Sequence, residues 1–187
     1  MIKEIENLIL SSSDIIKRSV NLSNQIETSV KTITECLRNE NKIIIFGNGG
    51  SAADAQHIAA EFIGRFKMEM KSYPAIAITT DTWIITSLSN DYSSDIIFSR
   101  QCESLVSKGD IVIGISTSGN SKNVENGIVT AKEKGAITIG LLGNHGGALK
   151  NMVDIPLIVE SSETPRIQEV HRVIYHIICE LVEDELV

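Results

Sequence analysis

The chain has 187 residues and a formal net charge of −7, from 24 acidic and 17 basic side chains, which is the size of one ordinary domain. One hydrophobic core at this length buries roughly 70% of the surface that the unfolded chain exposes, so folding requires neither disulfides nor a structural metal. The acidic balance and an aromatic content of 4% argue against a protein that binds nucleic-acid backbones or stacks on bases.

Features of a secreted or membrane-spanning protein are missing from the sequence. The apolar runs are strand-sized and far shorter than the ~18–20 residues that span a bilayer. The N-terminus lacks the apolar stretch of a signal peptide. Cys36, Cys102 and Cys179 are isolated and have no C-x-x-C spacing, so we expect reduced, buried thiols. These features predict a cytoplasmic protein without membrane or nucleic-acid partners.

The first forty residues have a helical pattern. One apolar stripe repeats at spacings of three and four residues, at Leu22, Ile26, Val30, Ile33 and Leu37. A similar set predicts an earlier helix, with a break near Asn21, and comprises Ile5, Leu8, Ile9, Ile16 and Val20. Such helices can pack on their own chain or on another subunit. We expect residues 1–40 to be a helical oligomerisation element of a single domain that spans residues 1–187.

From residue 41 onward, short apolar runs alternate with helical patterns. The runs predict five strands, at residues 42–46, 75–78, 110–115, 136–142 and 155–159. Helices are predicted from about residue 51, at 80–88, 95–106 and 124–134, and from about 163 to 186. This alternation is typical of βαβ units. We therefore expect residues 41–187 to form an α/β core, a three-layer αβα sandwich with a five-stranded, doubly wound, flavodoxin-like parallel sheet.

Ligands of open parallel sheets bind beyond the carboxyl ends of the strands, and a glycine-rich loop, residues 47–51, follows the first predicted strand. Its glycines would let the backbone approach a ligand, and the next helix would present free N–H groups to an anion. Ser51 and Asp54 have the spacing of a capping box for that helix. The loop is neither a dinucleotide nor a Walker fingerprint. A tight strand-to-helix turn would explain the same glycines.

A hydroxyl-rich loop, residues 116–121, follows the third predicted strand. It carries four hydroxyl groups in six residues, directly before a helix. Hydroxyls combined with the N–H groups of a helix N-terminus suit a phosphate monoester, whereas a simple helix cap needs one serine. The loop therefore predicts an anion site.

His57 and Glu61 are four residues apart on a predicted helix and so share one face. This pair could bind a metal, act in acid/base catalysis, or form an ordinary surface pair. The C-terminal helix offers Gln168, His171 and His176. Gln168 and His176 are roughly 12 Å apart along the axis and about 80° around it, and converge only if His176 leans toward the helix N-terminus. Spacing alone favours His171.

Five separated motifs, at residues 46–65, 73–78, 90–91, 114–121 and 166–171, resemble the sugar isomerase (SIS) domain proteins. Among them the sequence is most similar to the bacterial phosphoheptose isomerases, over essentially its whole length. This resemblance implies a homotetramer that converts sedoheptulose 7-phosphate to D-glycero-D-manno-heptose 7-phosphate. That reaction belongs to carbohydrate metabolism and opens heptose biosynthesis for lipopolysaccharide or capsule.

The resemblance also implies roles for particular residues. Glu61 and His176 correspond to the acid/base pair, with Glu61 as the base of an enediol mechanism. One zinc ion per subunit would be held by His57, Glu61, Gln168 and His176. The substrate contacts would be Asn48, Gly49, Gly50, Glu61, Asn90, Asp91, Ser116, Thr117, Ser118, Ser121 and Gln168.

A non-catalytic branch with the same resemblance is the alternative. Its members are scaffolds that bind a replication initiator protein, and the fold and the glycine-rich loop would not distinguish them from an isomerase. Scaffolds generally lack the carboxylate at position 61 and the imidazole at 176, and carry a bulky basic residue at 118. This chain has Glu61, His176 and Ser118, which favours the enzyme.

Overall fold

The computed structural model describes residues 1–69 and 71–187. Strands and helices alternate as predicted, with boundaries that differ by a few residues. The first half contains α1 (Ile2–Arg18), η1 (Ser19–Leu22), α2 (Ser23–Arg38), β1 (Ile43–Gly47), α3 (Gly50–Ile63), β2 (Ala75–Ala77) and α4 (Thr82–Asp91). The second half contains η2 (Ser94–Ile96), α5 (Ile97–Leu105), β3 (Ile111–Ser116), α6 (Lys122–Glu133), β4 (Ile137–Gly143), η3 (Asn144–Gly146), η4 (Leu149–Asn151), β5 (Ile155–Val159) and α7 (Thr164–Leu186).

The strands form one parallel sheet in the order β2-β1-β3-β4-β5. β1 lies between β2 and β3, with Ile43 opposite both Ala75 and Ile111. The chain therefore steps to one side of β1 for β2 and crosses to the other side for β3, β4 and β5. The predicted doubly wound sheet is confirmed. The side on which successive strands are added reverses between β1 and β3, and folds of this kind bind ligands at such a reversal.

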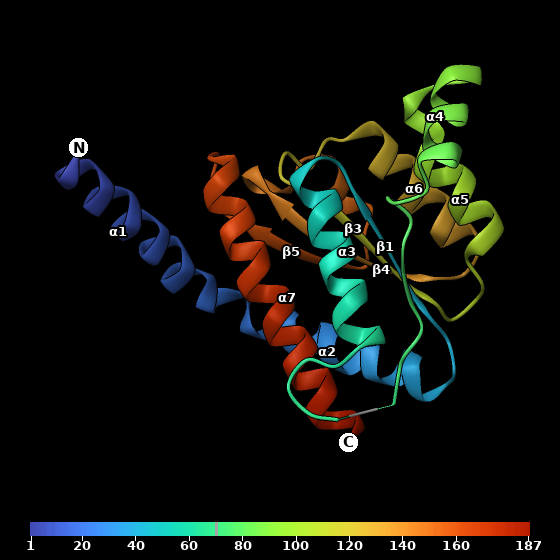
Figure 1. Ribbon diagram of the computed structural model, residues 1–187, viewed down its shortest axis with the longest axis horizontal. Helices are drawn as coiled ribbons and strands as arrows, with labels where there is room; N and C mark the ends of the chain where they lie inside the picture. The colour runs from blue at the N-terminus through green and yellow to red at the C-terminus, as the bar shows by residue number, and fades with distance from the viewer. Residues whose placement is uncertain (70) are drawn as a thin grey trace.

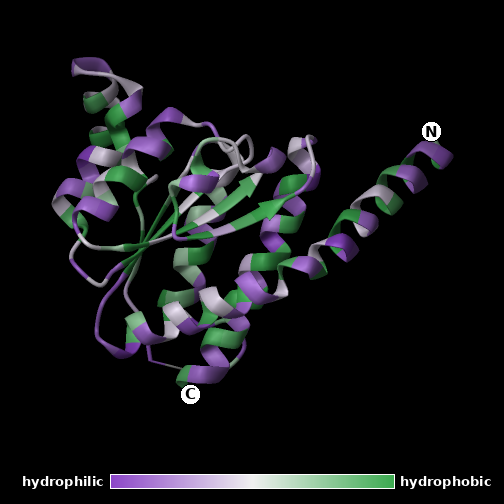
Figure 2. Ribbon diagram, turned by 180° about the vertical axis from the view of Figure 1, so that it is seen from behind, coloured by the Kyte–Doolittle hydropathy of each residue, from purple (hydrophilic) through white to green (hydrophobic). Residues whose placement is uncertain are grey.

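Helices cover both faces of this sheet, as the continuous apolar run of β1 predicts. Ile43 and Ile45 point into one core with residues of α2, α3 and α7, and Ile44 and Phe46 point into another with residues of α5 and α6. Figure 1 shows α3 and α7 side by side on one face, and Figure 2 shows the apolar strands enclosed between more polar helices. This arrangement confirms the three-layer αβα sandwich.

The two N-terminal helices behave differently, although both carry an apolar stripe. α2 buries its stripe against α7 and β5 of its own chain. α1 projects from the body (Figure 1), and its apolar side chains are exposed at Ile2, Ile5, Leu8, Ile9 and Leu10. The 3-10 turn η1 joins the two helices and confirms the predicted break near Asn21.

The three cysteines, Cys36, Cys102 and Cys179, are free and buried, as the sequence predicts. Burial raises the pKa of the Cys102 thiol to about 12, so it stays protonated at neutral pH. Among the described helices, none has the length and apolar character that crossing a bilayer requires.

Candidate active site

The glycine-rich loop and the hydroxyl-rich loop lie next to each other, after the neighbouring strands β1 and β3 between which the strand order reverses. They begin at the same level, because Gly47 at the end of β1 is paired with Ile115 of β3. Asn48 and Asn123, the latter in the first turn of α6, exchange two hydrogen bonds of 2.9 and 3.0 Å across this junction. The two sequence segments therefore lie together, at the edge where parallel sheets bind ligands.

At two positions of the glycine-rich loop, the backbone geometry requires glycine. A Cβ at Gly47 would lie 2.8 Å from the Ile115 carbonyl oxygen, and Gly49 has a positive φ of 56°. The predicted capping box is wrong. The N-cap of α3 is Gly49, two residues before Ser51, so Ser51 lies inside the helix and is buried. Asp54, in place of a reach back to the helix start, bonds to side chains of α7.

The hydroxyl-rich loop gathers three serines. Ser116 Oγ lies 2.9 Å from Ser121 Oγ and 3.4 Å from Ser118 Oγ, and it accepts a bond from the Gly119 amide at 3.1 Å. Ser121 is the N-cap of α6, yet its side chain makes no capping bond within the described part of the chain. The first amides of α6 and the serine hydroxyls are therefore arranged as an anion site would need.

His57, Glu61 and His176 converge between α3 and α7. His57 Nε2 lies 2.8 Å from Glu61 Oε1, and the candidate ligand atoms of all three residues lie within 4.8 Å of one another. The His57 and His176 rings meet edge to face, with centroids 5.1 Å apart. Burial and the neighbouring His57 lower the pKa of His176, so its imidazole is neutral at neutral pH.

α7 resolves the choice that spacing left open. His171 points into the core, where it is fully buried and its Nε2 lies 3.1 Å from the Leu142 carbonyl oxygen. Burial lowers the pKa of His171 to about 4, so it is a neutral core residue. His176 joins the cluster with His57 and Glu61, against the preference of spacing alone.

Gln168 lies beside the glycine-rich loop, about two turns of α7 before His176. A Cβ placed on Gly50 would lie 2.2 Å from Gln168 Nε2, so the absence of a side chain at Gly50 makes room for this amide. The other predicted substrate contacts of this loop, Asn48 and Gly49, directly precede Gly50 in the sequence.

Asn90 and Asp91 are the predicted site residues that this chain does not bring together with the others. They lie at the exposed end of α4, and Asn90 Nδ2 donates to Asp91 Oδ1 at 2.9 Å. α4 stands at the edge of the molecule (Figure 1), and none of its residues is buried. Trp83, on the same helix, is 86% exposed.

The sequence reasoning missed a second layer beneath His57, formed by Arg172 and Tyr175 of α7 together with Asp54. Tyr175 Oη lies 2.9 Å from His57 Nδ1, and Arg172 Nη2 donates to Asp54 Oδ1 at 3.1 Å. Helical spacing could have found both residues. Arg172 and Tyr175 are four and seven positions after Gln168, and so lie on the face that carries Gln168.

The cluster fits a transition metal by its donor chemistry. Two imidazoles and a carboxylate are suitable zinc ligands, and Gln168 could add an amide oxygen.

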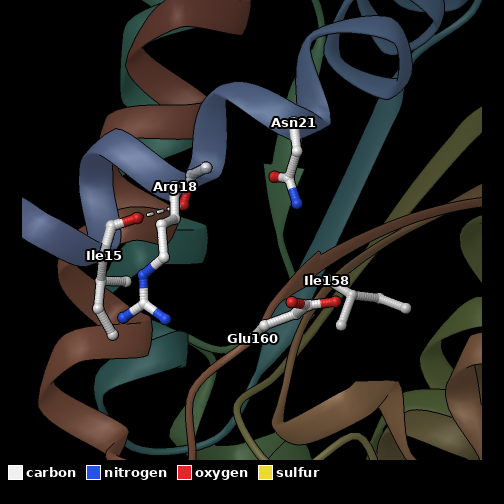
Figure 3. A pocket seen from close by; sticks show the side chains of 6 residues that line it. Ile15, Arg18, Asn21, Ile158 and Glu160 are labelled. Carbon is white, nitrogen blue, oxygen red and sulfur yellow. Dashed lines mark hydrogen bonds between the residues drawn. The ribbon is translucent and has the colours of Figure 1, made fainter.

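A small hollow lies beside β5, an edge strand that β3 and β4 separate from β1. Figure 3 shows it between the end of α1, η1 and β5, lined by Ile15, Arg18, Ser19, Asn21, Ile158 and Glu160. Ser19 Oγ donates to the Ile15 carbonyl oxygen there at 2.9 Å. None of the predicted site residues lines this hollow.

Comparison with known proteins gives a consistent family. The model of the SIS domain family matches residues 9–143. The phosphoheptose isomerase of Geobacter sp. strain M21 is 55% identical over 165 residues, covering 88% of this chain and 86% of that protein. The phosphoheptose isomerase of Geotalea daltonii is 50% identical over 187 residues, covering 100% of this chain and 97% of that protein.

Solved structures agree with this result over almost the whole chain. The phosphoheptose isomerase from Neisseria gonorrhoeae superposes with a TM-score of 0.93 at 37% identity, covering 98% of this chain and 100% of that one. The enzyme of the same name from Francisella tularensis gives a TM-score of 0.94 at 34% identity, with 98% of each chain covered.

Proposed function

The chain belongs to the SIS domain family, and from this premise we propose that it converts sedoheptulose 7-phosphate to D-glycero-D-manno-heptose 7-phosphate. Its relatives across nearly the whole chain are phosphoheptose isomerases, so it is an enzyme, a sugar-phosphate isomerase. The seven-carbon substrate and the place of the reaction in lipopolysaccharide or capsule heptose synthesis in the cytoplasm are the finer parts of the proposal.

The observation that carries the proposal is the Glu61 carboxylate held 2.8 Å from His57 and close to the neutral His176. Aldose–ketose isomerisation removes a proton from C1 of the ketose, passes through an enediol and returns a proton to C2. Glu61 takes the carbon-bound proton as general base. His176, which is neutral, moves the hydroxyl proton from O1 toward O2, since an uncharged imidazole can both accept and donate.

The phosphate group needs a fixed handle, because the reacting carbons must stay aligned with Glu61. Ser116, Thr117, Ser118 and Ser121 would hold it together with the first amides of α6. Asn48, Gly49, Gly50 and Gln168 would bind the sugar at the neighbouring loop. Asn90 and Asp91, which this chain does not bring together with the two loops, stay a prediction as further substrate contacts.

We propose one zinc ion per subunit, held by His57, Glu61, Gln168 and His176. When bound, zinc supplies a Lewis acid that polarises the carbonyl group of the sugar. The chain's own part is to present these four side chains from α3 and α7, which lie side by side (Figure 1).

We also propose that the chain is a homotetramer in which residues 1–40 act as the oligomerisation element. The exposed apolar side chains of the projecting α1 support this assembly, because a contiguous apolar face of this kind is uncommon on a monomer. Multi-angle light scattering should give four times the chain mass, and a stable monomer at micromolar concentration would refute the assembly.

A coupled assay with sedoheptulose 7-phosphate tests the proposed reaction. Glu61→Gln keeps the shape of the side chain and removes the base, so we expect turnover to fall by about 10²–10⁴. Glu103→Gln makes the same change of carboxylate to amide at an exposed position on α5. It is the matched control and should keep the parent's rate. Turnover of Glu61→Gln within about tenfold of the parent would refute the base assignment. A folded parent without aldose product, with or without zinc, would favour the initiator-binding scaffold.

A further inference from the structure

Three side chains form a polar network beneath His57, on the side of the ring that faces away from Glu61. Tyr175 Oη lies 2.9 Å from His57 Nδ1 and 3.4 Å from Asp54 Oδ1. Arg172 contacts both partners with a forked geometry, as its Nε donates to Tyr175 Oη at 3.0 Å and its Nη2 donates to Asp54 Oδ1 at 3.1 Å. Asp54 and Tyr175 are each 2% exposed. The contact between Asp54 and Tyr175 is thus closed to water, while the Arg172 side chain is 57% exposed.

The hydrogens available to this network can be counted. Four contacts each need one hydrogen, and the carboxylate of Asp54 can only accept. Arg172 supplies two hydrogens and Tyr175 supplies one. A tyrosine hydroxyl keeps its hydrogen at neutral pH, because its ordinary pKa is about 10. The hydroxyl hydrogen can go to Asp54 or to His57 Nδ1, and when it goes to Asp54 the fourth hydrogen comes from His57 Nδ1.

This count has a consequence on the opposite side of the ring. A neutral imidazole with its hydrogen on Nδ1 carries a lone pair on Nε2. That nitrogen lies 2.8 Å from Glu61 Oε1, which is also an acceptor. Two acceptors at this distance repel each other unless a proton or a metal cation lies between them. A hydrogen on Nε2 would instead donate to Glu61, whereas a neutral ring that binds a metal through Nε2 needs its hydrogen on Nδ1.

We propose that Tyr175, held by Asp54 and Arg172, is a positioning residue that fixes His57 as the Nδ1–H tautomer and directs Nε2 to a divalent metal ion. The inference rests on the proposed metal role of His57. Metal-binding histidines generally donate their second ring hydrogen to a partner that sets the tautomer, and loss of that partner weakens metal binding by about 10–100-fold. Here the partner is a tyrosine hydroxyl that passes the bond on to a buried carboxylate.

Tyr175 also contacts the second imidazole of the cluster. Its ring meets His57 and His176 edge to face, with centroid distances of 5.4 and 4.7 Å. One aromatic side chain therefore restrains the orientation of both rings, and its hydroxyl acts on His57 alone.

The tautomer can be measured directly in metal-free protein by ¹H–¹⁵N NMR of histidine-labelled samples, with His57 assigned from a His57→Gln variant. We expect the His57 hydrogen on Nδ1 in the parent. In Tyr175→Phe the Nδ1 acceptor is gone, and the hydrogen should move to Nε2, from which it can donate to Glu61. A parent in which His57 already carries its hydrogen on Nε2 would overturn the inference without any variant.

Zinc affinity gives a second readout, measured by competition with a chromogenic chelator. Tyr175→Phe should bind zinc about 10–100-fold more weakly, and Arg172→Lys, which keeps the charge but loses the fork, should show a smaller loss. Tyr73→Phe removes a hydroxyl outside the network and should match the parent. A purely structural role would lower the unfolding temperature of Tyr175→Phe and leave its zinc affinity and its tautomer unchanged, which would refute the proposal. Neither readout uses isomerase activity, so failure of the proposed reaction would be seen separately.

Discussion

The Glu183 carboxylate, near the end of α7, holds the segment that follows α3. It is 2% exposed and accepts hydrogen bonds from the backbone amides of Phe66, Lys67 and Met68 at 2.9 to 3.1 Å. Burial alone would raise the pKa of Glu183, but the three amides outweigh it and lower the pKa below its ordinary value. The Phe66 ring lies 5.6 Å from the ring of His176, so the same bonds hold one wall of the site.

Glu183→Gln keeps the shape of this side chain and removes its charge. Hydrogen bonds to a charged group contribute about 1.5–3 kcal/mol each, against about 0.5–1.5 for neutral groups. Two bonds weakened by about 1 kcal/mol each, and one backbone amide left facing the new NH₂ group at about 1–3 kcal/mol, give a destabilisation of roughly 4 kcal/mol. At about 2–4 °C per kcal/mol for a chain of this size, the unfolding temperature should fall by roughly 8–16 °C.

The matched control lies one turn earlier on the same helix. Glu180 pairs with Lys67 Nζ at 2.5 Å, and both side chains are largely exposed. Exposed pairs contribute about 0–1 kcal/mol, so Glu180→Gln should lower the unfolding temperature by no more than about 4 °C. Thermal unfolding followed by circular dichroism compares the two. If Glu183→Gln unfolds within about 2 °C of the parent, or no earlier than the control, the buried carboxylate does not hold this segment.

Three further substitutions test packing and pH dependence. Gly50→Ala should displace the flexible amide of Gln168, raising KM at least about tenfold with little change in unfolding temperature. Gly47→Ala places its Cβ against the Ile115 carbonyl oxygen and should lower stability by about 1–3 kcal/mol. An unaltered KM in a folded Gly50→Ala variant would place Gln168 outside the substrate site. The pKa of His171 is about 4 when folded and 6.5 in the reference state, so the unfolded chain binds more protons and stability falls as pH drops from 6.5 toward 4. At 1.36 kcal/mol per pKa unit this loss is roughly 3 kcal/mol, and denaturant unfolding of His171→Gln across that range should show a flatter pH profile; parallel profiles would contradict it.

Local sequence pattern predicted the fold because each element satisfies its own periodicity. The run of β-branched residues in β1 has no polar face, which requires helices on both sides of the sheet, and the structure buries it on both sides. The capping box failed for a local reason. Gly49 adopts a positive φ and is the N-cap in place of Ser51, so Asp54 lies two residues further into the helix and bonds with α7.

The N-terminal helices illustrate a limit of periodicity. α1 and α2 carry similar apolar stripes in the sequence, yet α2 buries its stripe in its own chain and α1 leaves most of its stripe exposed. An apolar stripe states that a helix has a face to cover, and the identity of the covering surface depends on contacts far away in the sequence.

The sequence by itself determined the two loops after β1 and β3 and the pairing of His57 with Glu61, because the succession of strand, loop and helix along the chain and the spacing within a helix are local properties. Only the tertiary structure decided which histidine of α7 completes the cluster. The rotation of α7 is set by its long-range packing, which turns His171 into the core and His176 toward His57. The same packing brings Tyr175 beneath the His57 ring. Helical spacing decides which residues share a face, whereas the docking of α7 on the sheet decides which residues that face contacts.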